Sequence, residues 1–398
     1  MNSKRRILAI LIVAVMALSI GVAEFRAETG QVYLPENLAE TAIDFTFDDL
    51  TPLKAINFED YKVIFVGEWH YSAMNPLIML AFIQFLNENY GVRHIIYERS
   101  YSEAFAVNEF LRTGDIELIY EKLRTRQNTQ TVEMRDFYVA LYEWNKTLPK
   151  DRQVMFVGID VHTHLTTTYI LRMFEILLPE DDDMPEIVAE VAGLLVLPDD
   201  GWTAFRPLSR ALGIIEGSED IFREYMGERY YDLYFGVRSA MQLVRMRVSG
   251  ESNKLAARER LMHENFALMY HTFGMERSFG MFGAAHTELD SEFFFAPDID
   301  EMAIAHYLNN VFEPTVGKVM NIEVMYHNSY LTVAGEVIPI DQESYRAYCI
   351  IRHDLAEIAA GDLAIFSTDG IVFDDKPLAD KAQFILLLQN SPGMTLLE

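Results

Sequence analysis

Cysteine is almost absent from this chain of 398 residues, since Cys349 is the single one. A lone cysteine excludes an internal disulfide, so packing of the core must hold the fold together. Cys349 lies in the apolar stretch 348–351, where a cysteine is most often a small buried core residue. No cysteine stands directly after the apolar run of residues 7–23, so a lipid-anchored lipoprotein is not indicated.

Basic residues are scarce as well. The chain has 33 Lys and Arg against 60 Asp and Glu, a formal net charge of -27. A surface of this sign repels phosphate backbones, so we expect no nucleic-acid partner. The simplest interpretation of the negative charge is that it keeps the protein soluble. The sequence also lacks internal repeats, low-complexity segments and a glycine-rich phosphate loop. Half of the residues are hydrophobic, which excludes disorder as the general state of the chain.

The N-terminal residues have the pattern of an export signal. Lys4, Arg5 and Arg6 precede the apolar run 7–23, and small residues suited to cleavage follow at Ala23 and Ala27. The run is long for a signal peptide and short for a membrane span, so residues 1–27 are either a signal peptide or an uncleaved N-terminal anchor. Both predict an exported protein, periplasmic, extracellular or tethered outside the cytoplasm, with membrane attachment through residues 7–23 only.

Strand-like and helix-like segments alternate from residue 61 onward. The expected strands are 61–66, 94–97 and 153–157, followed by 279–282, 318–326, 364–367 and 383–388; the expected helices are 76–90, 104–111 and 132–146. Strand–helix–strand units of this length imply parallel strands joined by right-handed crossovers. The pattern predicts an α/β fold with a central mixed, mostly parallel sheet flanked by helices.

Residues 166–275 differ from the rest because their hydrophobic period is almost entirely helical. We interpret residues 28–398 as a single domain in which this segment is a helical insertion. Tyr225, Tyr230, Tyr231, Tyr234 and Phe235 crowd one part of it, a pattern more typical of core than of a ligand site. A helical insertion between strands can also act as a cap over a crevice.

Two short motifs place a histidine just after a strand-like run. These are Gly67-Glu68-Trp69-His70 and Gly283-Ala284-Ala285-His286. In open α/β sheets, ligands bind in the crevice beyond the carboxyl ends of the strands. Although more than two hundred residues separate the motifs, we expect both histidines to contribute to one shared site.

Carboxylates accompany these histidines in the sequence. Glu68 is two residues before His70, and Glu98 and Asp160 each follow an expected strand. A carboxylate beside an imidazole raises its basicity and fixes its tautomer, as a general base for water requires. His286, or a cation such as Arg258, could then stabilise an oxyanion that develops on a carbonyl.

Each of these residues also has a plainer interpretation. A histidine after a strand is usually a hydrogen-bonded turn residue, and an arginine on a helix usually makes an ion pair. His162 and His164 have the spacing of a metal-binding pair, which is common by chance. The residues alone leave an enzyme, a binding protein and a chain without activity all open.

Five elements in order resemble the erythromycin-esterase-like family, within the broader set that includes ChaN-type haem-binding proteins and Tiki-type metalloproteases. The resemblance covers most of residues 60–290. It rests on Gly67-Glu68-Trp69-His70; Tyr97-Glu98-Arg99 with 106–110 and Gly114; Phe156-Val157-Gly158-Ile159-Asp160; Arg258-Glu259 with Met262, Glu264 and Asn265; and Gly283-Ala284-Ala285-His286.

The resemblance implies a hydrolase that cleaves an ester, lactone or amide bond in a small-molecule substrate with water activated by His70. Glu68, Glu98 and Asp160 would orient groups or share the proton, and His286 and Arg258 would hold the carbonyl. The single residue between Glu68 and His70 is more similar to the ChaN and Tiki members. Two alternatives therefore stay open: a haem or small-ligand binding protein, and a metal-dependent peptidase. The sequence requires no cofactor, and His70, Glu98 and His286 are the candidate ligands of a divalent metal.

Overall fold

The computed structural model describes residues 32–120, 131–161, 166–179, 182–197, 204–248, 254–290, 302–333, 335–340, 346–373 and 375–396. The predicted leader, residues 1–27, lies outside them. The chain divides into two compact units. The first comprises residues 1–90, 124–138 and 281–398, and the second comprises 91–123 and 139–280. No helix in the described ranges is both long and apolar enough to cross a membrane.

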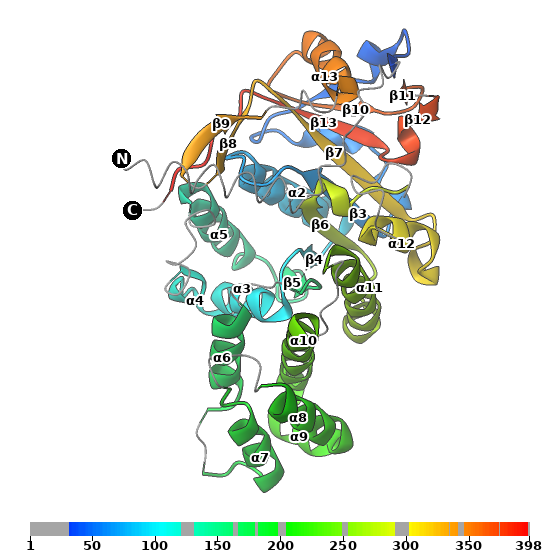
Figure 1. The fold of residues 1–398 in the computed structure, drawn as a ribbon. Coiled ribbons are helices and arrows are strands. Elements are labelled where there is room, and N and C mark those ends of the chain that lie inside the picture. Colours follow the sequence, from blue (N-terminus) through cyan, green and yellow to red (C-terminus); the bar gives the residue numbers. More distant parts are fainter. Residues whose placement is uncertain are drawn as a thin grey trace, which may run out of the picture. The chain divides into compact units, whose positions relative to one another are not determined.

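An eight-stranded mixed sheet has the strand order β2-β10-β13-β7-β3-β6-β4-β5 (Figure 1). Most of its neighbouring strands for which a register is given are parallel, and the antiparallel pairs are β10 with β13 and β10 with β2. Helices flank the sheet. The predicted α/β fold with a mixed, mostly parallel sheet is therefore confirmed.

In the first unit the parallel strands are β3 (Val63–Glu68), β7 (Val319–His327) and β13 (Phe384–Gln389). Their register places Gly67 opposite Glu323. Beyond β13 lie β10 (Leu363–Ser367) and β2 (Ile43–Asp44). All of β3 except its last residue is buried, which is why its sequence is a continuous apolar run rather than an alternating one.

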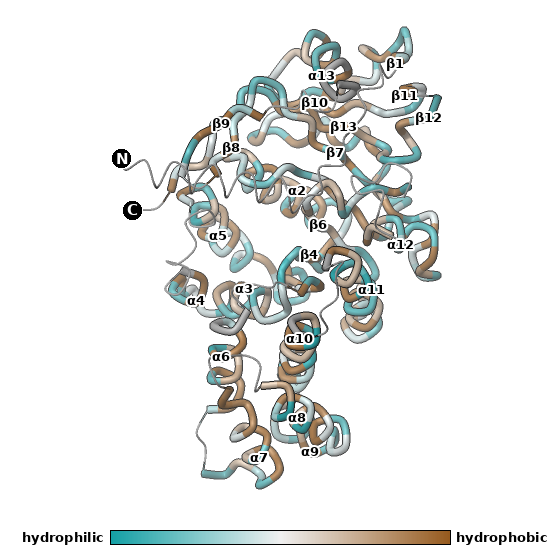
Figure 2. The backbone as a smooth tube through the Cα atoms, viewed as in Figure 1, coloured by the Kyte–Doolittle hydropathy of each residue, from teal (hydrophilic) through white to brown (hydrophobic). Residues whose placement is uncertain are grey.

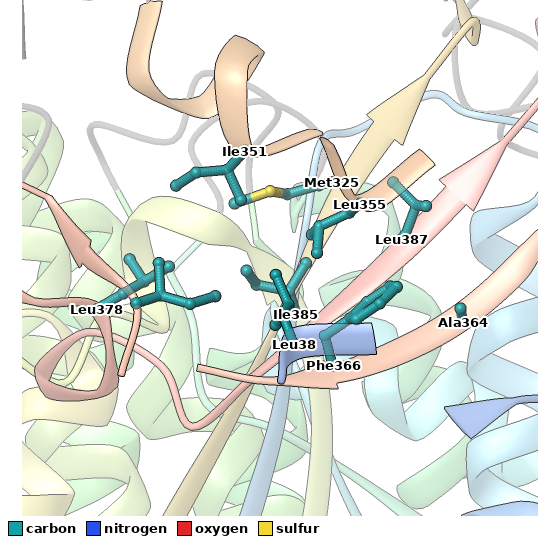
Figure 3. Close-up of a cluster of buried hydrophobic side chains, with 10 residues drawn as sticks. Leu38, Met325, Ile351, Leu355, Ala364, Phe366, Leu378, Ile385 and Leu387 are labelled. Carbon is teal, nitrogen blue, oxygen red and sulfur yellow. The ribbon is translucent and has the colours of Figure 1, made fainter. Parts of the chain in front are cut away.

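The helices of the first unit are α2 (Asn75–Tyr90), α12 (Ile304–Asn310) and α13 (Arg346–Ile358). Figure 3 shows Ile351 and Leu355 of α13 packed with Met325 of β7, Phe366 of β10 and Ile385 of β13. Two smaller sheets complete the unit: β1 (Val32–Tyr33) with β11 (Val372–Phe373) and β12 (Lys376–Pro377), and the hairpin β8 (Tyr330–Val333) and β9 (Glu336–Pro339). The sequence pattern did not predict β2, α13 or these sheets.

In the second unit β4 (His94–Tyr97) and β5 (Met155–Gly158) pair in parallel, with Tyr97 opposite Gly158. Helix α3 (Tyr101–Thr113) follows β4. It starts at a capping box formed by Ser100 and Glu103, and it ends at Gly114, whose φ of 77° is left-handed. Two elements link the units along the chain: α5 (Val132–Asn145) and β6 (Ser278–Gly283).

The remaining helices of the second unit occupy the segment predicted to be helical. They are α4 (Glu117–Tyr120), α6 (Thr166–Leu177), α7 (Glu186–Leu194), α8 (Phe205–Gly217), α9 (Glu219–Met226), α10 (Tyr230–Val248) and α11 (Lys254–Phe273), of which α4 alone precedes residue 166. Helix α8 buries Leu208, Ala211 and Ile215 at helical spacing, and hydrophobic and hydrophilic residues alternate along it in Figure 2. That these helices form a cap over the crevice stays a prediction.

Candidate functional site

Glu68 and His70 meet at the carboxyl end of β3. His70 Nδ1 and Glu68 Oε1 share a short hydrogen bond. Glu68 has 10% of its side chain exposed and His70 has 49%, so a largely buried carboxylate holds an imidazole that reaches solvent. The predicted pairing of these two residues is present. With Nδ1 held by the carboxylate, Nε2 is the nitrogen that can accept a proton.

Two residues that the sequence reasoning did not select hold Glu68 in place. Asn75, at the start of α2, donates from Nδ2 to Glu68 Oε2 and to the carbonyl of Trp69, the latter at 2.8 Å. Tyr326 of β7 donates its hydroxyl to Asn75 Oδ1 at 2.8 Å and accepts from the Trp69 amide at 3.2 Å. Both side chains are buried. Burial and the nearby Glu68 raise the pKa of Tyr326 well above its usual range, so its hydroxyl stays a donor.

The backbone after His70 is held in an uncommon conformation. Tyr71 has a φ of 75°, in the left-handed region that a residue with a side chain seldom adopts. Its carbonyl accepts from the amide of Thr332 in β8 at 3.2 Å. Such a strained residue persists where its surroundings over-determine it, often at functional sites.

The C-terminal segment, residues 391–396, supplies further restraint. Ser391 and Ser72 are buried and share a hydrogen bond of 2.6 Å between their hydroxyls. The amide of Ala73 donates to the carbonyl of Pro392 at 3.2 Å. The same segment reaches the start of α5, since Val132 donates its amide to Thr395 at 2.8 Å. The loop that carries His70 is thus restrained by residues of the C-terminal segment.

His286 lies on the short 3-10 helix Ala284–His286, directly after β6, and is buried. This turn packs against the end of β3 at Gly67. A Cβ at position 67 would lie 3.3 Å from the Ala284 Cα and closer still to Thr287 Oγ1, so glycine is needed there. The two histidine motifs are therefore neighbours within the first unit, each beginning with a glycine at a strand end.

A buried triad of ionisable side chains lies beside these motifs and was not predicted. Lys381 is within 3.2 Å of Glu288 and 3.0 Å of Glu323, and all three side chains are almost completely buried. Glu288 follows His286 by two residues, and Glu323 is opposite Gly67 in the sheet. Burial raises the pKa of Glu288 to about 8; Glu323 adds to the rise and Lys381 opposes it. The protonated, neutral form of Glu288 is therefore favoured near neutral pH, and Lys381 is the cation that compensates the buried carboxylate of Glu323.

The second unit assembles the other three predicted residues. Arg258 of α11 donates from Nε and Nη2 to the two carboxylate oxygens of Asp160 at 2.7 and 2.6 Å, and from Nη2 to Glu98 at 2.7 Å. Asp160 is fully buried, and Glu98 and Arg258 are 11% and 22% exposed. Burial lowers the pKa of Arg258, but Asp160 and Glu98 raise it by more, so the net pKa lies above its usual range. The guanidinium stays charged.

Close approach of β5 to the end of β4 makes this cluster possible. A Cβ at Gly158 would lie 2.6 Å from the carbonyl carbon of Ser100 and 2.9 Å from the Arg99 oxygen. The amide of Asp160 can therefore donate to the Arg99 carbonyl at 3.1 Å. On α11, Asn265 donates to the Ile159 carbonyl at 2.8 Å, which fixes the helix that presents Arg258.

The predicted residues thus fall into two local groups. Glu68, His70 and the turn of His286 belong to the first unit, and Glu98, Asp160 and Arg258 belong to the second. That the two groups form one site stays a prediction. His162 and His164 lie outside the described residues. Among the residues that are described, no group of three or more His, Cys, Asp and Glu side chains is arranged to hold a metal ion.

Comparisons with known proteins identify the fold. No family model and no curated protein matches the chain. Three solved structures match over nearly their whole length. A protein from Bacillus cereus has a TM-score of 0.65 at 13% identity and covers 90% of this chain and 98% of its own. A succinoglycan biosynthesis protein has a TM-score of 0.63 at 14% identity, over 90% and 97%. An erythromycin esterase in its open conformation has a TM-score of 0.59 at 14% identity, over 92% and 99%.

The chain shares its fold with these proteins. At this identity the likeness establishes architecture alone, because one fold hosts many activities. The resemblance read from the sequence is thereby supported at the level of the fold.

Proposed function

We propose that the protein is a hydrolase that cleaves an ester, lactone or amide bond with water activated by His70. The observation that carries this proposal is the bond from Glu68 to His70 Nδ1 at the end of β3, with Asn75 and Tyr326 holding the carboxylate. A base held in this way has the features that general-base catalysis needs: a fixed tautomer, a solvent-accessible ring and a countercharge. The fold shared with an erythromycin esterase is consistent with it.

In the proposed reaction, His70 Nε2 accepts a proton from water as the water oxygen attacks the carbonyl carbon of the substrate. Glu68 stabilises the imidazolium that forms, and the proton then passes from Nε2 to the leaving oxygen or nitrogen. Asn75 and Tyr326 act by positioning, because they keep the carboxylate aimed at Nδ1. The attack leaves negative charge on the carbonyl oxygen, which requires donors.

His286 is the proposed donor to that oxygen, because its turn packs at Gly67 in the same unit as His70. Within the second unit, Asp160 and Glu98 hold the Arg258 guanidinium through Nε and Nη2. A role of Arg258 toward the substrate stays a prediction from the sequence.

The proposal is tested with p-nitrophenyl esters, a macrolide lactone and a peptide panel, using the wild-type chain and three variants. We expect His70→Asn and Glu68→Gln to lower kcat on the accepted substrate by about 10²–10⁴-fold. His271→Asn, an exposed histidine of α11, is the matched control and should leave kcat unchanged. Unaltered hydrolysis by His70→Asn would contradict the proposal.

A divalent metal is the alternative means of activating the water. Its candidate ligands, His70, Glu98 and His286, belong to different units, and the described residues of neither unit gather a group of three suitable side chains. We therefore derive no step through a metal. Activity abolished by a chelator and restored by Mn²⁺ or Zn²⁺ would favour the metal-dependent mechanism over the one proposed.

A further inference from the structure

Helices α8, α10 and α11 of the second unit line a partly open cavity of about 190 Å³. Its polar lining comes from Arg238, Gln242 and Arg245 of α10 and from Arg260 and Glu264 of α11. Its apolar lining comes from Leu212, Met241, Met246, Ala257 and Leu261. The catalytic proposal does not use any of these residues.

The lining residues follow helical spacing. On α11 the positions are 257, 260, 261 and 264, and on α10 they are 238, 241, 242, 245 and 246, so each helix presents one stripe to the cavity. A different stripe of α11 carries Arg258 and Asn265, which bond to Asp160 and to the Ile159 carbonyl. One helix therefore serves the cluster around Asp160 on one stripe and this cavity on another.

Positive charge prevails in the lining, although the chain as a whole has a net charge of -27. Three arginines face one carboxylate, that of Glu264, which is exposed. Arg238 Nη2 forms an ion pair with Glu264 at 3.7 Å, a distance too long for a hydrogen bond. Arg238 Nε is buried, and no described residue accepts a hydrogen bond from it. A buried donor that lacks an acceptor is unfavourable, and a bound anion would supply one.

The size and the apolar wall narrow the class of ligand. A cavity of about 150 Å³ can hold a benzene ring, so 190 Å³ accommodates a ring-sized body. Sites for drug-sized molecules and cofactors start at about 300 Å³, which makes haem too large. Inorganic phosphate would accept a hydrogen bond from Arg238 Nε but leave Leu212, Met241 and Met246 facing water. A carboxylate on a compact apolar body satisfies both parts of the lining.

We infer that this cavity binds a small organic carboxylate, whose head pairs with Arg238 and whose apolar body packs on Leu212, Met241 and Met246.

Isothermal titration of the full chain with benzoate tests the inference, with benzyl alcohol and inorganic phosphate as comparison ligands. We expect saturable binding of benzoate and much weaker binding of the other two. Arg238→Gln should weaken benzoate binding about ten- to hundredfold, since charge-assisted hydrogen bonds are lost. Leu212→Trp, which fills the cavity and keeps the arginines, should weaken it as well.

Two control variants separate this site from the rest of the molecule. Arg172→Gln removes an exposed arginine of α6 that pairs with Glu175, and it should bind benzoate like the wild type. His70→Asn should also bind like the wild type, which shows that benzoate is not occupying the proposed catalytic site as a product. Circular dichroism confirms the folding of each variant; if Arg238→Gln does not fold, Leu212→Trp decides. No saturable binding by the wild type, equal binding of phosphate, or full binding by both cavity variants would overturn the inference.

Discussion

Gly158→Ala is the substitution for which the structure gives the clearest expectation. The added Cβ would lie 2.6 Å from the carbonyl carbon of Ser100 and 2.9 Å from the Arg99 oxygen. Both are backbone atoms, so no side chain can swing away. Ordinary van der Waals contact starts at 3.4 Å, so β5 and the segment after β4 must separate by at least about 0.8 Å (3.4 − 2.6).

That separation acts on two backbone hydrogen bonds. The Ile159 amide donates to Tyr97 at 3.3 Å and the Asp160 amide donates to Arg99 at 3.1 Å, and neither tolerates such lengthening. Each lost bond costs about 1 kcal/mol, and overpacking of a filled interior costs about 1–3 kcal/mol more. We expect Gly158→Ala to lower the free energy of unfolding by roughly 3–5 kcal/mol.

Gly213→Ala is the matched control because it makes the same chemical change in the same unit. Gly213 is an exposed residue inside α8, and a Cβ there would meet nothing within 4 Å. Alanine favours helix by about 1 kcal/mol over glycine, so this variant should be more stable than the wild type. Urea unfolding followed by circular dichroism and tryptophan fluorescence measures both. A Gly158→Ala protein as stable as the wild type would refute the reasoning from close approach.

Three further outcomes are expected. Lys381→Met leaves the buried Glu323 carboxylate without its cation and should destabilise the chain by about 3–5 kcal/mol in urea unfolding; a loss below about 1 kcal/mol would mean that Lys381 does not compensate this charge. Burial raises the pKa of Asp232 from 3.8 to about 6 against the opposing bond from Tyr101 and the charge of Arg229. Between these two pH values the folded state holds a proton that the unfolded chain has released. The stability contributed by Asp232 is therefore complete below pH 3.8 and is lost as the pH rises to about 6. Asp232→Asn should flatten that part of the curve of unfolding free energy against pH, and an unchanged slope would count against this assignment. Ser100→Ala removes the capping box of α3 and should cost about 1 kcal/mol, measured by the same unfolding experiment, with no cost if the cap is unimportant.

Much of the sheet could be predicted because its strands are buried on both faces. Continuous apolar runs located β3, β4, β5, β7 and β13 to within about two residues at each end. The hairpin β8–β9 escaped this reasoning because β9 is exposed along its whole length and carries no hydrophobic pattern. Helix α13 escaped because its apolar residues were attributed to a short stretch around Cys349.

The candidate site was predicted in part, for a similar reason. Glu68, Glu98 and Asp160 were found because ionisable residues at strand ends are visible in a sequence. Asn75 and Tyr326 were missed because an asparagine at a helix start and a tyrosine within a strand have common structural uses. Lys381 was missed because its carboxylate partners come from separate strands and turns, and only the sheet register places Glu323 beside Gly67.

The bond between Ser72 and Ser391 has a consequence for how the protein is made. The two residues are 319 positions apart in the chain. During synthesis the loop that carries His70 leaves the ribosome long before the serine that restrains it, and β7, which supplies Tyr326, is also translated late. The pair of Glu68 and His70 therefore gains these restraints only after nearly the whole chain has emerged. A ribosome-bound nascent chain that stops before residue 391 would carry His70 without the contact between Ser72 and Ser391.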